Sequence, residues 1–107
     1  MSAPEAVVVL FTAATPEDVA RIGKALVGEG LAACVNVVPG IRSIYRWEGK
    51  VRDEPEALGI AKARRDAVER LVARLKALHA YKVPEILALP ILAGNPDYLA
   101  WVAGNGS

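Results

Sequence analysis

The sequence contains little of the chemistry that most enzyme and metal sites require. Its 107 residues include one cysteine, one histidine and one phenylalanine. The single cysteine, Cys34, excludes a disulfide within the chain and fits a reducing compartment, so we expect a cytoplasmic protein. With only this cysteine and His79, one chain cannot build a zinc motif of the Cys/His type.

Nucleotide-binding signatures are also missing, because neither GxxxxGK[ST] nor GxGxxG occurs. No convincing Ser-His-Asp set can be assembled around a single histidine. An acyl-phosphate hydrolase would need an anion-cradling loop with an arginine, and Thr12–Pro16 contains neither glycine nor arginine. We therefore expect no enzymatic activity and no organic cofactor.

Charge and hydropathy exclude two further classes. The formal net charge is +1 with both signs interspersed, which argues against a nucleic-acid-binding face. No apolar run approaches the roughly 20 residues of a membrane helix. The hydrophobic fraction of 53% and the length predict one globular domain spanning residues 1–107.

The region Leu31–Arg64 predicts two unusually long strands joined by a turn at Glu48–Lys50. β-Branched and aromatic residues dominate both arms, and Pro39-Gly40 indicates a bulge in the first one. Each arm exceeds the usual strand of about five or six residues. A hairpin of that length overhangs a small domain, so we expect its edges to pair with another subunit. Tyr45 and Trp47, near the tip, are candidate interface residues.

The remaining segments predict alternating strands and helices. Ala6–Ala13 is a continuous apolar run typical of a strand buried on both faces. Thr15 and Pro16 begin a helix, and Gly28 or Gly30 ends it.

A second helix begins at Asp66, where Glu69 completes a capping-box-like pair, and it ends near His79. A last strand over Glu85–Leu92 and a short helix over Asp97–Ala103 follow. The β-α-β-β-α-β order predicts an α+β, ferredoxin-like fold with a long central hairpin and a short C-terminal helix. Both main helices cover one sheet face, and the uncovered face favours a closed ring of subunits.

Few side chains are candidates for chemistry, and each has a structural alternative. Cys34 is either a small buried residue or a soft ligand for Cu(I). His79 is either a residue favoured at a helix C-terminus or an imidazole ligand for Cu(II) or Zn(II). Tyr81 and Glu85 flank a rigid Pro84 and suit the lip of a pocket, although Glu85 can instead pair with Lys62 or Arg64. The acidic run Asp53, Glu54 and Glu56 is a solvated strand edge or, as the minor alternative, a weak cation site.

Three stretches together resemble one protein family. They are LAACVNVVPGIRSIYRWEGKV, HAYKVPEILALPI and GNPDYLAWV. In this order they are similar to the CutA family of divalent-cation tolerance proteins, and the resemblance covers nearly the whole chain. It implies a ferredoxin-like subunit in a tight trimer, similar to the PII signalling proteins, with the hairpins paired between subunits.

The resemblance also implies a role in copper and divalent-metal tolerance, with metal candidates His79 and Cys34. Family members implicated in copper binding have a cysteine where this chain has Phe11, and two adjacent histidines where it has Leu78 and His79. Their following proline is Ala80 here. The resemblance therefore implies weak metal binding, with the inter-subunit clefts near Lys62, Tyr81 and Glu85 as candidate ligand sites. The alternative is a PII-like signalling or scaffold trimer that binds a small anionic metabolite.

Overall fold

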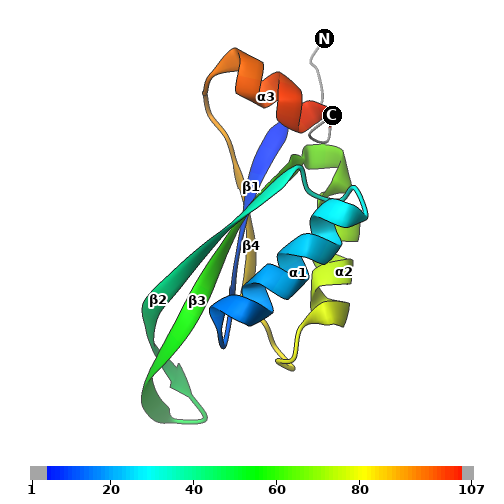
Figure 1. Cartoon of the computed structure of the whole chain (residues 1–107). Helices are drawn as coiled ribbons and strands as arrows, with labels where there is room; N and C mark the ends of the chain where they lie inside the picture. The colour runs from blue at the N-terminus through cyan, green and yellow to red at the C-terminus, as the bar shows by residue number, and fades with distance from the viewer. Residues whose placement is uncertain (1–4, 105–107) are drawn as a thin grey trace.

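The computed structural model describes residues 5–104 and has the predicted α+β, ferredoxin-like order (Figure 1). Four antiparallel strands form one sheet in the order β2-β3-β1-β4. The elements are β1 (Ala6–Ala13), α1 (Pro16–Gly28), β2 (Cys34–Trp47), β3 (Lys50–Arg64), the short 3₁₀ helix η1 (Arg65–Ala67), α2 (Val68–Leu78), β4 (Ile86–Pro90) and α3 (Pro96–Ala103).

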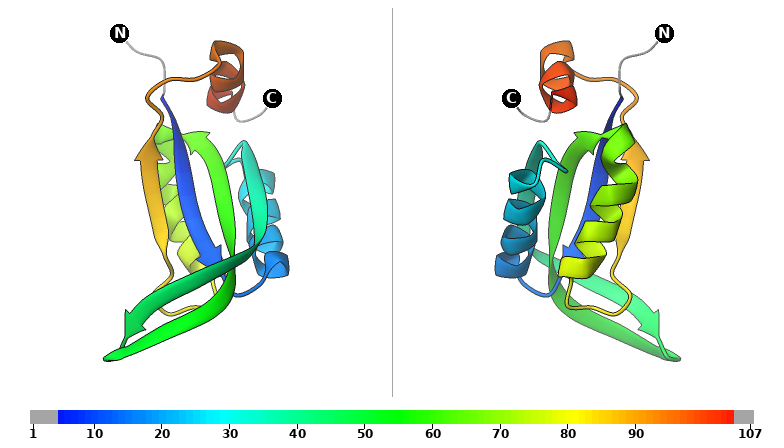
Figure 2. Two further views of the ribbon diagram at one scale, coloured as in Figure 1. Left: turned by 90° about the vertical axis from the view of Figure 1, so that its left-hand side faces the viewer. Right: turned by 90° about the vertical axis from the view of Figure 1, so that its right-hand side faces the viewer.

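The core lies between the sheet and the two main helices, which share one face of the sheet (Figure 2). Alternate residues of the central strands point into it, as the two-residue period of a strand requires. Full burial of one leucine stabilises the fold by roughly 1.5–3 kcal/mol. The fully buried larger side chains are Val9, Phe11, Val19, Ile22, Leu26, Leu71, Leu75 and Val102.

Helix α1 begins as the sequence predicts. The Thr15 hydroxyl accepts a hydrogen bond from the Asp18 amide at 3.1 Å, and Pro16 occupies the first turn. Gly30, at φ 74°, follows the helix in the left-handed conformation that glycine adopts at little cost. The predicted stop at Gly28 or Gly30 is therefore confirmed.

The start of the second helix differs from the prediction. A 3₁₀ turn at Arg65–Ala67 comes first, α2 begins at Val68, and no side chain caps it. The Asp66 carboxylate instead accepts two hydrogen bonds from the Arg64 guanidinium, at 2.9 and 2.6 Å. The capping-box prediction for Asp66 and Glu69 was wrong because the arginine takes the carboxylate that a cap would need.

The long hairpin has the predicted turn and bulge. Glu48 and Gly49 have φ of 50° and 79°, as expected for a tight hairpin turn. The β2–β3 register shifts between Val38 and Ile41, at Pro39-Gly40. Strand β3 pairs with β1 only from Ala57 onward, so the distal half of the hairpin projects beyond the sheet (Figure 2).

The sheet face opposite α1 and α2 is largely open. Leu87 and Leu89 alternate with the core-facing Ile86 and are 53% and 45% exposed. Helix α3 lies at the end of the sheet where β1 begins (Figure 1). Strand β4 is shorter than predicted, because its pairing with β1 ends at Pro90, which has no amide hydrogen.

Candidate functional site

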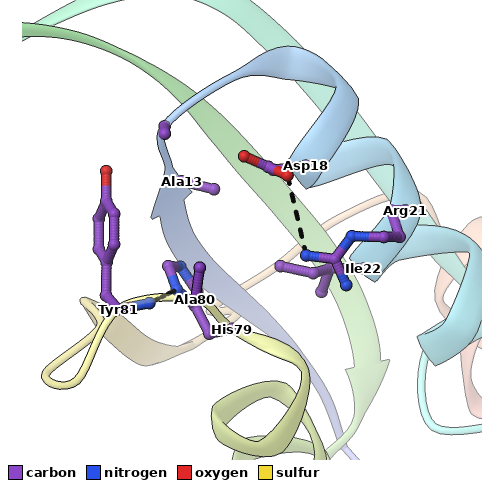
Figure 3. Close-up of a pocket in the computed structure, with 8 residues that line it drawn as sticks. Ala13, Asp18, Arg21, Ile22, His79, Ala80 and Tyr81 are labelled. Atoms are coloured by element: carbon purple, nitrogen blue, oxygen red, sulfur yellow. Dashed lines mark hydrogen bonds and ion pairs between the residues drawn. The ribbon is translucent and has the colours of Figure 1, made fainter.

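His79 lies directly after α2, where the chain leaves the helix with extended backbone angles. Its Nε2 atom is 2.6 Å from the Thr12 carbonyl oxygen, at the end of β1. Its Nδ1 atom accepts a hydrogen bond from the Tyr81 amide at 3.0 Å. Both ring nitrogens therefore have protein partners, and the His79 and Tyr81 rings lie 4.7 Å apart (Figure 3).

Tyr81 continues from this loop to the hairpin. Its hydroxyl donates a hydrogen bond to Glu56 Oε2 at 2.8 Å. Burial of the phenol, together with the adjacent Glu56 carboxylate, raises the pKa of Tyr81 to about 12. One step further along the hairpin, Tyr45 donates to Glu54, and this hydrogen bond raises the pKa of Tyr45. Tyr45 and Tyr81 thus each donate a hydrogen bond to a glutamate, and the two glutamates lie on the same face of β3.

A small pocket opens beside His79 and Tyr81 (Figure 3). Arg21 of α1 is its positively charged side chain and donates to the Leu78 carbonyl at 3.2 Å. Asp18 lies 3.8 Å from the same guanidinium. The charges in the pocket therefore largely compensate one another.

Cys34 and Lys62 lie at the other end of the sheet as a cross-strand pair. The Lys62 ammonium donates to the Asn36 side chain and, at 3.4 Å, to the Ile60 carbonyl. Tyr98 of α3 reaches Cys34, and burial together with that thiol raises the pKa of Tyr98. Cys34 is neither fully buried nor freely exposed.

One subunit does not bring the predicted cleft residues together. Glu56, the partner of Tyr81, is six residues from Lys62 along β3, a separation of about 20 Å at roughly 3.3 Å per residue. Glu85 is exposed and forms no ion pair with any residue between 5 and 104, so the predicted pairing with Lys62 or Arg64 is absent. A cleft that contains Lys62, Tyr81 and Glu85 would need more than one subunit.

The two metal candidates also lie apart. His79 is hydrogen-bonded to Thr12 of β1, which lies opposite Leu58 of β3. Cys34 of β2 lies opposite Lys62, further along the same strand β3. Four residues of strand separate these positions by about 13 Å. No group of three or more His, Cys, Asp or Glu side chains within residues 5–104 is arranged to hold a metal ion.

Phe11 fills the β1 position at which copper-binding members of the similar family were expected to have cysteine. The ring is fully buried and lies over Gly59 of β3, where a Cβ atom would come within 2.2 Å of it. This position therefore belongs to the core of the protein.

Sequence reasoning did not find the partners of the candidate residues. The sequence predicts a solvated strand edge at Glu54 and Glu56, whereas in the structure they accept hydrogen bonds from Tyr45 and Tyr81. It gives no signal that Asn36, Tyr98 or the Thr12 carbonyl would be partners of Lys62, Cys34 and His79. The regular alternation of β3 places Glu54 and Glu56 on one face, and this was the one signal available for them.

Comparison with known proteins identifies the family. The model of the CutA1 divalent ion tolerance protein family matches residues 7–105. This chain belongs to that family. The divalent-cation tolerance protein CutA of Thermus thermophilus is 53% identical over 98 residues, which are 92% of this chain and 95% of that protein.

Solved CutA1 structures agree with this assignment. The Thermus thermophilus structure has a TM-score of 0.91 at 51% identity and covers 95% of this chain and 99% of its own. The Oryza sativa CutA1 crystal structure has a TM-score of 0.92 at 43% identity, covering 99% and 98%. The chain spans about half the length of the chloroplastic relatives from rice and Arabidopsis, at 54% and 53%. None of the helices described between residues 5 and 104 is long and apolar enough to span a membrane.

Proposed function

We propose that this CutA-family chain forms a homotrimer that serves divalent-metal tolerance, binds copper or another divalent ion weakly, and has no enzymatic activity. The family assignment supports the metal-tolerance role. A cytoplasmic location, self-association as the main partnership and the absence of nucleic-acid binding are parts of the same proposal.

The trimer is supported by apolar surface that one subunit leaves open. On the distal hairpin, Ile44 and Val51 are each 66% exposed, and Trp47 is 46% exposed. Leu87 and Leu89 add exposed side chains on the uncovered sheet face. Burying such side chains between subunits stabilises an assembly at about 25 cal/mol per Å² of apolar area. Tyr45 is 40% exposed and belongs to the same predicted interface.

Weak metal binding is the version of the family role that these residues support. His79 can bind a metal only by giving up a hydrogen bond to Tyr81 or Thr12. Cys34 stays the candidate soft ligand for copper, with no other cysteine or histidine near it within residues 5–104. A single soft ligand per subunit gives a site that loses its metal readily.

Copper titration of the wild type, Cys34→Ser and His79→Ala tests the metal part. The proposal predicts weak copper uptake that Cys34→Ser reduces. Unchanged uptake in both variants would remove both residues as metal ligands, and no uptake by the wild type would refute copper binding. The alternative, a trimer that binds an anionic metabolite, predicts instead that a metabolite raises the melting temperature in a thermal-shift screen.

A further inference from the structure

We infer that His79 is a positioning residue in this protein, not a metal ligand. Its ring joins the end of β1 to the loop between α2 and β4 through two hydrogen bonds. One runs from His79 Nε2 to the Thr12 carbonyl and the other from the Tyr81 amide to His79 Nδ1. These two bonds are called the His79 clasp below.

The clasp requires one tautomer of the imidazole. A backbone amide can only donate, so Nδ1 must accept the Tyr81 hydrogen bond with its lone pair. A carbonyl oxygen can only accept, so the proton must be on Nε2 to donate to Thr12. Both requirements are met by the same neutral ring, with the proton on Nε2.

The clasp explains how Tyr81 reaches the hairpin. The chain leaves α2 at His79, whose own amide keeps only a long hydrogen bond of 3.4 Å to the Lys76 carbonyl. The clasp fixes the Tyr81 backbone two residues later, and the ring contact at 4.7 Å orients the phenol. The hydroxyl then meets Glu56 at 2.8 Å. Three segments far apart in sequence, at β1, the loop and β3, are joined through one histidine.

A metal ion does not fit at this ring. On the Nδ1 side it would meet the Tyr81 amide hydrogen, which repels a cation. On the Nε2 side it would replace the proton that is donated to the Thr12 carbonyl oxygen. No group of three or more His, Cys, Asp or Glu side chains in the described chain could complete such a site, and Leu78 and Ala80 flank His79. The copper role of this family position, implied by resemblance, therefore disagrees with the residues present here.

Long-range ¹H–¹⁵N NMR of the imidazole tests the clasp directly. The protein has one histidine, so the ring signals need no assignment by mutation. We expect the Nε2–H tautomer, with both ¹⁵N shifts and the Tyr81 amide unchanged when Zn²⁺, a diamagnetic probe, is added in excess. A Zn²⁺-dependent shift of either ring nitrogen, or the Nδ1–H tautomer, would overturn the inference.

Two variants separate positioning from general packing. In His79→Ala, the Tyr81 amide loses its acceptor, and its hydrogen exchange should become about tenfold faster, as expected for one lost hydrogen bond. The matched control, Tyr81→Phe, keeps the backbone bond and should retain slow exchange at residue 81 and the Nε2–H tautomer. Equal exchange in wild type and His79→Ala would contradict the clasp, and an unfolded His79→Ala variant would leave the wild-type NMR result decisive.

The outcome is independent of the proposed function. Total Zn²⁺ and copper uptake is measured on the same samples by elemental analysis after dialysis. Metal bound without a change at His79 supports both proposals, and metal bound at His79 overturns only the clasp. No metal uptake with an intact clasp supports the clasp and refutes the metal part of the proposed function.

Discussion

Replacing Gly59 by alanine should destabilise the fold because a side chain already occupies the space. An ideal Cβ at this position would lie 2.2, 2.4 and 2.7 Å from the Cζ, Cε1 and Cε2 atoms of Phe11. Real Cβ atoms essentially never approach other heavy atoms within 3.0 Å. Phe11 is fully buried in the core between the sheet and the helices, so its ring has little room to retreat.

The size of the effect follows from two opposing contributions. Overpacking a close-packed core typically costs about 1–3 kcal/mol, and contacts this short favour the upper half of that range. Against this, alanine loses less backbone entropy on folding than glycine, which stabilises the folded state by roughly 0.5–1 kcal/mol. This gain applies because Gly59 does not have the positive φ that would strain an alanine. We expect a net loss of about 2 kcal/mol in the free energy of unfolding.

A double-mutant cycle with Phe11→Leu tests this explanation. Urea unfolding at fixed protein concentration should give a coupling energy of about 2 kcal/mol, because the smaller leucine leaves room for the new methyl group. Gly28→Ala is the matched control, since a Cβ there meets nothing within 4 Å, and it should be neutral or slightly stabilising. Wild-type stability of Gly59→Ala, or an equal loss in both backgrounds, would refute the steric argument.

Three further predictions concern pH, packing and assembly. The folded state favours the neutral Tyr81 phenol, so its contribution to stability is present below the ordinary tyrosine pKa near 10 and is lost as pH rises toward about 12. Tyr81→Phe should show a smaller decline than the wild type in unfolding titrations, because Tyr45 and Tyr98 keep their raised pKa values. Identical curves would contradict this prediction. Leu75→Ala removes a fully buried side chain and should cost about 2–5 kcal/mol in urea unfolding; a loss below about 1 kcal/mol would show that the site is not close-packed. Tyr45→Asp and Trp47→Asp should each weaken the trimer in sedimentation experiments, because a charge would be desolvated at the interface; a fully trimeric variant would place that side chain outside the contact.

Local signals were sufficient for most of the fold. The apolar run Ala6–Ala13 formed a strand because its β-branched residues suit a pleated sheet. The predicted burial on both faces was wrong, because residues along most of the strand alternate between buried and partly buried. Pro39-Gly40 and Glu48-Gly49 marked the bulge and the turn through backbone preferences that depend on few neighbours. The start of α2 was missed because the Asp66 carboxylate can accept either from the backbone amides of the first helical turn or from Arg64, and the sequence does not show which partner it takes.

The site was harder to predict because its partners come from distant segments. His79 binds a backbone carbonyl 67 residues away, and a carbonyl leaves no mark in the sequence. Tyr81 meets Glu56, and Tyr98 meets Cys34, only after the sheet has set the register of β3 and brought α3 to its end. Residue types identified His79, Tyr81 and Cys34 as notable, but not what each one contacts.

Native mass spectrometry with and without added Cu(II) tests the central claim most directly, because it reports assembly and metal content together. The account predicts a trimer in both samples, with copper bound to the trimer in the second sample and lost after buffer exchange. A monomer would contradict the assembly inferred from the hairpin and the open sheet face. A trimer that takes up no copper would contradict the copper-binding part of the proposed function.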